Sequence, residues 1–334
     1  MPAGCRAFSF RSLFFLWVLT FAGWAWAQDD ISEGHIAPRD AVAANTTMAT
    51  DSALNTYSKP IRKTVDLVLV PVTITDSLNR LVVGLRQDNF QVFEGKERQS
   101  IQHFSSEDAP VSVGIIVDTS GSMKFKMDRA QEAVKQFCAA ANPQDEFFMI
   151  TFSNQPLLVA DFTSRPEEVE NKLLFARAQG ETSLLDAIYL GINKMREAKY
   201  PRKALLIISD GGDNHSRYTE KEVKSSVKEA DVVIYAVGTY DRYFPTQEER
   251  LGPELLSDIA EVTGGQAFTL DNPNDLPEVV GRVGVALRNQ YVLAYRPENT
   301  LRDGKWHKIK IKLRIPKLAF LHVHAKTGYY AASE

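Results

Sequence analysis

Five residues with oxygen-bearing side chains fall in three short segments of this chain, and their types suit a hard divalent cation. Asp118, Ser120 and Ser122 lie in the first segment, Thr182 in the second and Asp210 in the third. Mg²⁺ takes about six oxygen ligands and often retains waters. Hydroxyls and carboxylates supply that chemistry without sulfur or imidazole. We therefore expect a divalent cation bound by these five residues, with Mg²⁺ favoured and Mn²⁺ or Ca²⁺ as alternatives.

The spacing of the first segment has a physical reason. In an extended loop, every second side chain points the same way, so Asp118, Ser120 and Ser122 can converge on one ion. We expect Gly121 to allow a tight backbone path between the two serines. Taken singly, Asp118 and the two serines are as typical of a turn and a helix cap as of a metal site. Thr182 alone is more typical of a helix N-cap, and Asp210-Gly211 alone of a turn. The coincidence of all three segments at predicted strand ends favours the metal site.

The elements that would position these segments alternate between strand and helix. Nearly continuous apolar runs predict central strands buried on both faces, and shorter, more polar runs predict edge strands. The central runs are 111–117, 147–152, 204–208 and 232–237, the edge runs are 157–162 and 266–270, and the helical stretches are 128–141, 166–176, 184–198, 219–230, 253–262 and 274–288. This alternation predicts an α/β fold over residues 108–290, a doubly wound, mostly parallel sheet with helices on both faces. Ligands of such sheets bind beyond the carboxyl ends of the central strands.

Two β-rich segments, residues 60–107 and 291–331, flank the α/β region. The first contains β-branched or alternating runs at 65–76, 81–83, 90–94 and 101–104, and the second contains them at 291–295, 308–313 and 321–324. Such short runs, separated by turn residues, predict antiparallel strands. The economical arrangement is one small β-sandwich-like module built from both segments. Two independent β appendages are the alternative.

The first 27 residues have the three-part layout of a secretory signal peptide. Arg6 and Arg11 precede an apolar run from 13 to 24, and Ala25-Trp26-Ala27 matches a small-x-small cleavage pattern. The run is shorter than the roughly 20 apolar residues that span a bilayer, which disfavours an uncleaved anchor. We expect an exported protein, periplasmic or extracellular, without a membrane span after cleavage. Residues 28–59 are polar and aperiodic, which predicts a disordered linker.

Charge and cysteine content exclude some functions. The formal net charge of −3 becomes −5 when the two arginines of the leader are removed, and no basic block remains, so nucleic acid is a poor partner. Cys138 is then the only cysteine, so no internal disulfide can form, and its helical surroundings predict a buried, inert thiol. His322 and His324 alternate on one strand. Because no cysteine or third histidine stands nearby, we expect exposed strand histidines and no zinc site.

The three segments resemble the metal-ion-dependent adhesion site of von Willebrand factor type A and integrin I domains. That site combines Asp-x-Ser-x-Ser with a threonine in a second loop and Asp-Gly in a third. The resemblance covers about residues 110–290. Its flanks, 72–95 and 291–330, are similar to a bacterial family called VWFA-related, which extends the resemblance to about 65–331.

The resemblance implies a role for each residue. Ser120 and Ser122 would bind the metal through their hydroxyls, and Thr182 directly or through water. Asp118 and Asp210 would act mainly through bound waters. Ser209 stands where many relatives have threonine, which is a mild departure.

These features together predict an adhesion-type, metal-dependent protein-binding module without catalytic activity. A metal surrounded mostly by neutral ligands can accept an Asp or Glu side chain of a partner protein. A structural scaffold, in which the metal only ties the loops together, is the alternative. A metal-dependent hydrolase is a third, but His215 is the only histidine near the loops to act as a base, and no serine-hydrolase or nucleotide-binding motif is present. A phospho-acceptor role for Asp118 would leave the serines and Thr182 unexplained.

Overall fold

The structure, a computed structural model, describes residues 67–210, 212–240, 247–298, 303–315 and 320–331. These residues belong to one compact unit that runs from Arg62 to Glu334. The predicted leader, residues 1–27, and the predicted linker, residues 28–59, lie outside the described residues. Among the described residues, no helix has both the length and the apolar character needed to cross a bilayer.

A six-stranded sheet forms the centre of the α/β domain. Its strand order is β10-β9-β8-β5-β6-β7, and all neighbours are parallel except β6 and β7. The strands are β5 (Ser112–Asp118), β6 (Glu146–Phe152), β7 (Pro156–Thr163), β8 (Lys203–Ser209), β9 (Val233–Thr239) and β10 (Ala267–Leu270). Every residue of β5, β6 and β9 is buried, as expected for strands covered on both faces. The predicted fold class is confirmed.

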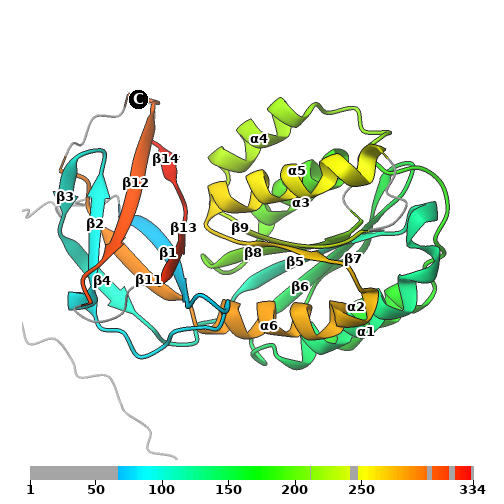
Figure 1. The fold of residues 1–334 in the computed structure, drawn as a ribbon, viewed down its shortest axis with the longest axis horizontal. Coiled ribbons are helices and arrows are strands. Elements are labelled where there is room, and N and C mark those ends of the chain that lie inside the picture. The colour runs from blue at the N-terminus through cyan, green and yellow to red at the C-terminus, as the bar shows by residue number, and fades with distance from the viewer. Residues whose placement is uncertain (1–66, 211, 241–246, 299–302, 316–319, 332–334) are drawn as a thin grey trace, which may run out of the picture. The chain divides into compact units, whose positions relative to one another are not determined.

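Among the described residues, α-helices cover both faces of this sheet (Figure 1). One face carries α1 (Met127–Ala139), α2 (Pro166–Leu174) and α6 (Leu276–Arg288), and the other carries α3 (Leu184–Lys194), α4 (Glu220–Glu229) and α5 (Gln247–Thr263). Each set of helices encloses a separate apolar core against the sheet. The helix α4 begins with a capping box, in which Thr219 accepts a hydrogen bond from the Glu222 amide and the Glu222 carboxylate accepts one from the Thr219 amide.

Strands from the two flanking segments pair with one another in two four-stranded sheets. One sheet has the order β13-β1-β11-β4 and the other β14-β12-β2-β3. The strands are β1 (Val68–Thr75), β2 (Phe90–Glu94), β3 (Glu97–Gln99), β4 (Ile101–Ser105), β11 (Tyr291–Tyr295), β12 (Trp306–Leu313), β13 (His322–Ala325) and β14 (Gly328–Tyr330). Their inward residues, such as Val72, Phe90 and Tyr291, form one apolar core. We call this part the β module.

The structure corrects three expectations about local elements. Residues 81–83 do not form a strand, because only Leu81 makes an isolated bridge, to Thr75, before Gly84 turns the chain with a φ of 81°. The helix α5 begins at Gln247, so Pro253 lies inside it and not at its first turn. His324 is half-buried and hydrogen-bonded to the Thr75 hydroxyl, so of the two strand histidines only His322 is exposed.

Candidate functional site

The five predicted ligands lie on three loops at the carboxyl end of the parallel sheet. Asp118 ends β5, and the loop that follows it carries Ser120 and Ser122 into a short 3₁₀ helix, Gly121–Phe125. Asp210 follows β8, which is the neighbour of β5 in the sheet. Thr182 lies two residues before α3. The parallel register of β5 and β8 therefore places two of the three loops side by side.

Asp118 is the most buried member of the set, with none of its surface exposed. One carboxylate oxygen accepts a hydrogen bond from the Ser209 hydroxyl at 2.6 Å, and the other accepts one from the Ser120 amide at 2.8 Å. Burial, and after it the nearby charge of Asp210, together raise the pKa of Asp118 to about 7. Two buried carboxylates thus repel one another at the end of β5 and β8. A cation between them would relieve that repulsion.

The three hydroxyl residues of the predicted set differ in how far they are exposed to solvent. Ser120 is buried and Ser122 is exposed, and their hydroxyl oxygens are 3.0 Å apart. Thr182 is buried. Because the exposed hydroxyl marks an open side, an outside group can approach the site.

Backbone hydrogen bonds tie the first and second loops directly. The Gln179 amide donates to the Thr119 carbonyl at 2.9 Å, and the Gly121 amide donates to the Gly180 carbonyl at 3.0 Å. The close path that was expected at Gly121 depends more on Gly180, which has a φ of 84° and where an added Cβ would lie 2.5 Å from the Asn154 amide oxygen. An added Cβ at Gly121 would meet only an ordinary 3.4 Å contact.

The second and third loops are tied in the same way. The Thr182 carbonyl accepts hydrogen bonds from the amides of Asn214 and His215, at 3.0 and 3.1 Å. The Thr182 amide donates to the side-chain oxygen of Asn214 at 2.9 Å. Hydrogen bonds within the chain therefore join the second loop to both the first and the third.

The donor set fits a hard cation. It consists of two carboxylates and three hydroxyls, all of them oxygen. Within the described ranges, no group of three or more histidine, cysteine, aspartate or glutamate side chains could hold a metal, so a site here must use hydroxyls. Among the described residues, the buried hydroxyls of Ser183 and Thr239 have no hydrogen-bond partner. Ser183 follows the predicted ligand Thr182, and Thr239 ends β9, so further polar atoms are available at this edge of the sheet.

Lys126 is a residue of this site that the sequence reasoning missed. Its ammonium group donates hydrogen bonds to the Asp210 carboxylate at 3.2 Å and to the Thr239 carbonyl at 3.1 Å. Both charged side chains are largely shielded from solvent. The ammonium group therefore competes with any bound cation for the charge of Asp210. No local pattern around Lys126 indicates this contact, because Asp210 lies 84 positions further along the chain.

Other residues singled out in the sequence take no part in the set. His215 lies at the rim, where its side chain is half-exposed and paired with Glu181. Cys138 is buried on the face of α1, and burial raises the pKa of its thiol to about 12, as expected for an inert thiol. The histidines of β13 lie in the β module.

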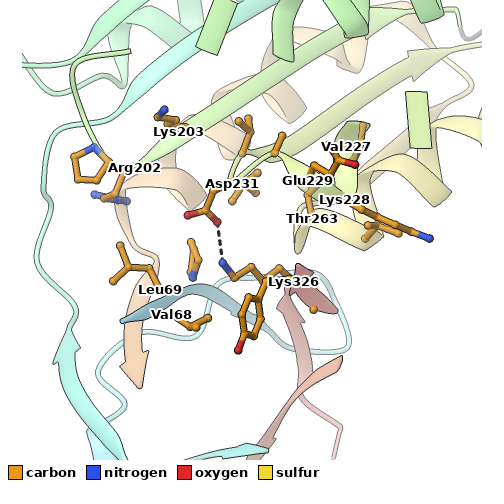
Figure 2. A pocket seen from close by; sticks show the side chains of 18 of the residues that line it. Val68, Leu69, Arg202, Lys203, Val227, Lys228, Glu229, Asp231, Thr263 and Lys326 are labelled. Carbon is orange, nitrogen blue, oxygen red and sulfur yellow. Dashed lines mark hydrogen bonds and ion pairs between the residues drawn. The ribbon is translucent and has the colours of Figure 1, made fainter. Parts of the chain in front are cut away.

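A separate cavity of about 300 Å³ lies at the other edge of the sheet, where β8 and β9 begin (Figure 2). Residues of β1, α4 and the β13–β14 turn line it, and Lys326 donates a 2.8 Å hydrogen bond to Asp231 across it. Many of the lining residues are aliphatic. Arg202, which also lines the cavity, donates a hydrogen bond from its guanidinium group to the Leu287 carbonyl at 2.5 Å. None of the five predicted ligands lines this cavity.

Comparison with known families decides the class of this domain. The family model described as "von Willebrand factor type A domain" matches residues 113–212, which contain all five predicted ligands. Residues 113–212 are thereby identified as a von Willebrand factor type A (VWA) domain.

Known proteins similar to this chain match it over part of their length. The bovine (Bos taurus) inter-alpha-trypsin inhibitor heavy chain H4 is 25% identical over 134 residues, 36% of this chain and 15% of that protein. The chain thus spans under a fifth of this curated relative. Among solved structures, a von Willebrand factor type A protein from Catenulispora acidiphila is 14% identical, covers 80% of this chain and 74% of its own, and has a TM-score of 0.47. The pilus adhesin SpaC of Lactobacillus rhamnosus GG, in its open conformation, is 12% identical and has a TM-score of 0.45. The match covers 77% of this chain and 49% of the SpaC chain.

Proposed function

We propose that this VWA domain is a metal-ion-dependent protein-binding module that is exported from the cell. Ser120, Ser122 and Thr182 would hold a divalent cation, Mg²⁺ by preference, while Asp118 and Asp210 orient its waters. When bound, the cation would supply an electrophilic position that accepts a carboxylate oxygen of a partner's Asp or Glu. The leader at residues 1–27 supports export.

One observation carries the proposal. The buried carboxylates of Asp118 and Asp210 lie at the same edge of the sheet as the exposed residue Ser122. Burial and the repulsion by Asp210 both raise the pKa of Asp118, and both favour a bound cation beside its ionised carboxylate. The exposure of Ser122 leaves that cation accessible from outside. A cation that is both electrostatically favoured and accessible suits recognition of an anionic group.

The two other functions receive less support. A purely structural metal has little to do, because hydrogen bonds already join the three loops without it. A hydrolase would need a base beside the metal, and His215 is held at the rim by Glu181. The geometry therefore favours a non-enzymatic binding role.

Calorimetric titration of Mg²⁺ into the wild type and Asp118→Ala tests the metal site. We expect a saturable heat for the wild type only, and equal heats in both would contradict the site. The binding function is tested with envelope fractions of the source cells passed over the immobilised protein. A partner retained in Mg²⁺ and released by EDTA is expected, and it should be absent with Asp118→Ala. We call the contact of the cation with the partner's carboxylate the metal bridge. Retention of the partner in the presence of EDTA would contradict it.

A further inference from the structure

Two phenylalanines on the loops of the candidate metal site are almost fully exposed. Phe125, at the end of the 3₁₀ helix, is 91% exposed, and Phe175, directly after α2, is 83% exposed. Leu174 beside it is also exposed. A phenylalanine gains from leaving water and is costly to display on a surface, so exposed apolar clusters mark interaction sites.

The structure brings these side chains to the same end of the domain. The loop with Phe125 and the loop with Phe175 are joined by the hydrogen bonds between residues 119 and 179 and between 121 and 180. A further bond runs from the Gln131 side chain, in the second turn of α1, to the Leu173 carbonyl at 3.2 Å. The start of α1 and the end of α2 are therefore neighbours, and each displays a phenylalanine beside the candidate metal site.

The charges on these loops complement an acidic partner. Residues 119–126 and 174–183 contain three bases, Lys124, Lys126 and Arg177, and one acid, Glu181. Glu181 is paired with His215, whereas Lys124 is exposed with its ammonium group 5.8 Å from the centre of the Phe125 ring. Each loop thus presents an aromatic ring together with a positive charge.

We propose that Phe125, Phe175 and Leu174 form an apolar rim that selects the partner of the metal site. The occupant is a protein segment in which an Asp or Glu is flanked by aliphatic or aromatic side chains. The carboxylate reaches the cation, as the proposed function states, and the flanking apolar side chains are buried against the rim. Specificity then comes from the rim, because a metal–carboxylate contact alone accepts any accessible acidic residue.

The test uses a random 12-residue peptide library displayed on phage, selected on the immobilised mature chain in Mg²⁺. Enriched peptides should contain an Asp or Glu next to apolar residues. A synthetic peptide with the most enriched sequence is then titrated into the wild type, Phe125→Ser and Phe175→Ser. Each substitution is expected to weaken peptide binding by about 10-fold or more, as for a central aromatic contact. Phe320→Ser is the matched control, since Phe320 is 81% exposed and belongs to the β module.

The outcomes separate the rim from the metal bridge. The Mg²⁺ affinity of both phenylalanine variants should equal that of the wild type, because neither side chain is a predicted ligand. Peptides that need Mg²⁺ but bind both variants as tightly as the wild type would overturn the rim alone. Peptides that bind equally in EDTA, yet lose binding in both variants, would overturn the metal bridge and support the rim. Enriched peptides that lack apolar residues, or no enrichment, would overturn the rim.

Discussion

Replacing Asp118 with asparagine should stabilise the metal-free protein while it abolishes metal binding. The carboxylate is fully buried beside Asp210, and these surroundings raise its pKa from 3.8 to about 7. At about 1.4 kcal/mol per pH unit, the ionised form destabilises the folded protein by about 4 kcal/mol above pH 7. Asparagine has nearly the same shape and no charge. It loses part of the hydrogen bonding to Ser209 and Ser120, which costs about 1–2 kcal/mol.

The net expectation is a gain of about 2–3 kcal/mol for Asp118→Asn in EDTA at pH 8. Because the folded pKa of this acid is raised, its carboxyl group does not destabilise the wild type below the unfolded pKa of 3.8. The free energy of unfolding of the wild type then falls as pH rises from 3.8 toward 7. The advantage of the variant should therefore shrink at pH 5.

Urea unfolding at pH 8 and pH 5, each with EDTA or excess Mg²⁺, measures these differences. Excess Mg²⁺ should stabilise the wild type by about 3 kcal/mol at a hundredfold excess over its Kd and leave the variant unchanged. Asp88→Asn, at an exposed position of the β module, is the control and should change little in any condition. An Asp118→Asn protein that is less stable than the wild type in EDTA at pH 8 would refute the electrostatic reasoning.

Two further predictions concern the loop that carries Thr182 and the β module. Gly180→Ala should destabilise the protein by about 1–2 kcal/mol, because its φ of 84° is left-handed, and should weaken Mg²⁺ binding measured by calorimetry; unchanged Mg²⁺ affinity would show that this loop does not hold the metal. The hydrogen bond to Glu94 and that to Asp303 raise the pKa of His307, so its contribution to stability is present below pH 6.5 and is lost as pH rises through the folded pKa. Urea midpoints between pH 6 and 9 should therefore fall more in the wild type than in His307→Gln, and parallel curves would contradict this assignment.

The sheet and the grouping of the predicted ligands could be foreseen because both depend on simple rules. Apolar runs of strand length, such as residues 111–117, favour central strands, and the carboxyl ends of parallel strands meet at one edge of the sheet. Asp118 and Asp210 were therefore expected at the same edge of the sheet, and the pairing of β5 with β8 makes them neighbours there. The capping box at Thr219 is a local feature of the same kind, since it depends only on residues three apart.

Features that depend on tertiary packing could not be foreseen. The Lys126 ammonium group reaches Asp210 only because the 3₁₀ helix ends and α1 begins beside β8, and no local pattern encodes that placement. The apolar run at 81–83 resembled a strand, yet the turn at Gly84 leaves Val83 exposed. The exposure of Phe125 was also hidden, since a single phenylalanine in an amphipathic stretch reads as core.

Diffraction from crystals soaked in Mn²⁺, with anomalous data, tests the central claim most directly. The proposal predicts one strong Mn²⁺ peak bonded to the hydroxyl oxygens of Ser120 and Ser122, with Asp118 and Asp210 facing its waters. It also predicts that the Lys126 ammonium group moves away from Asp210 when the ion binds. A saturating soak that leaves Lys126 on Asp210, with no anomalous peak between the three loops, would contradict the claim that this VWA domain holds a metal there.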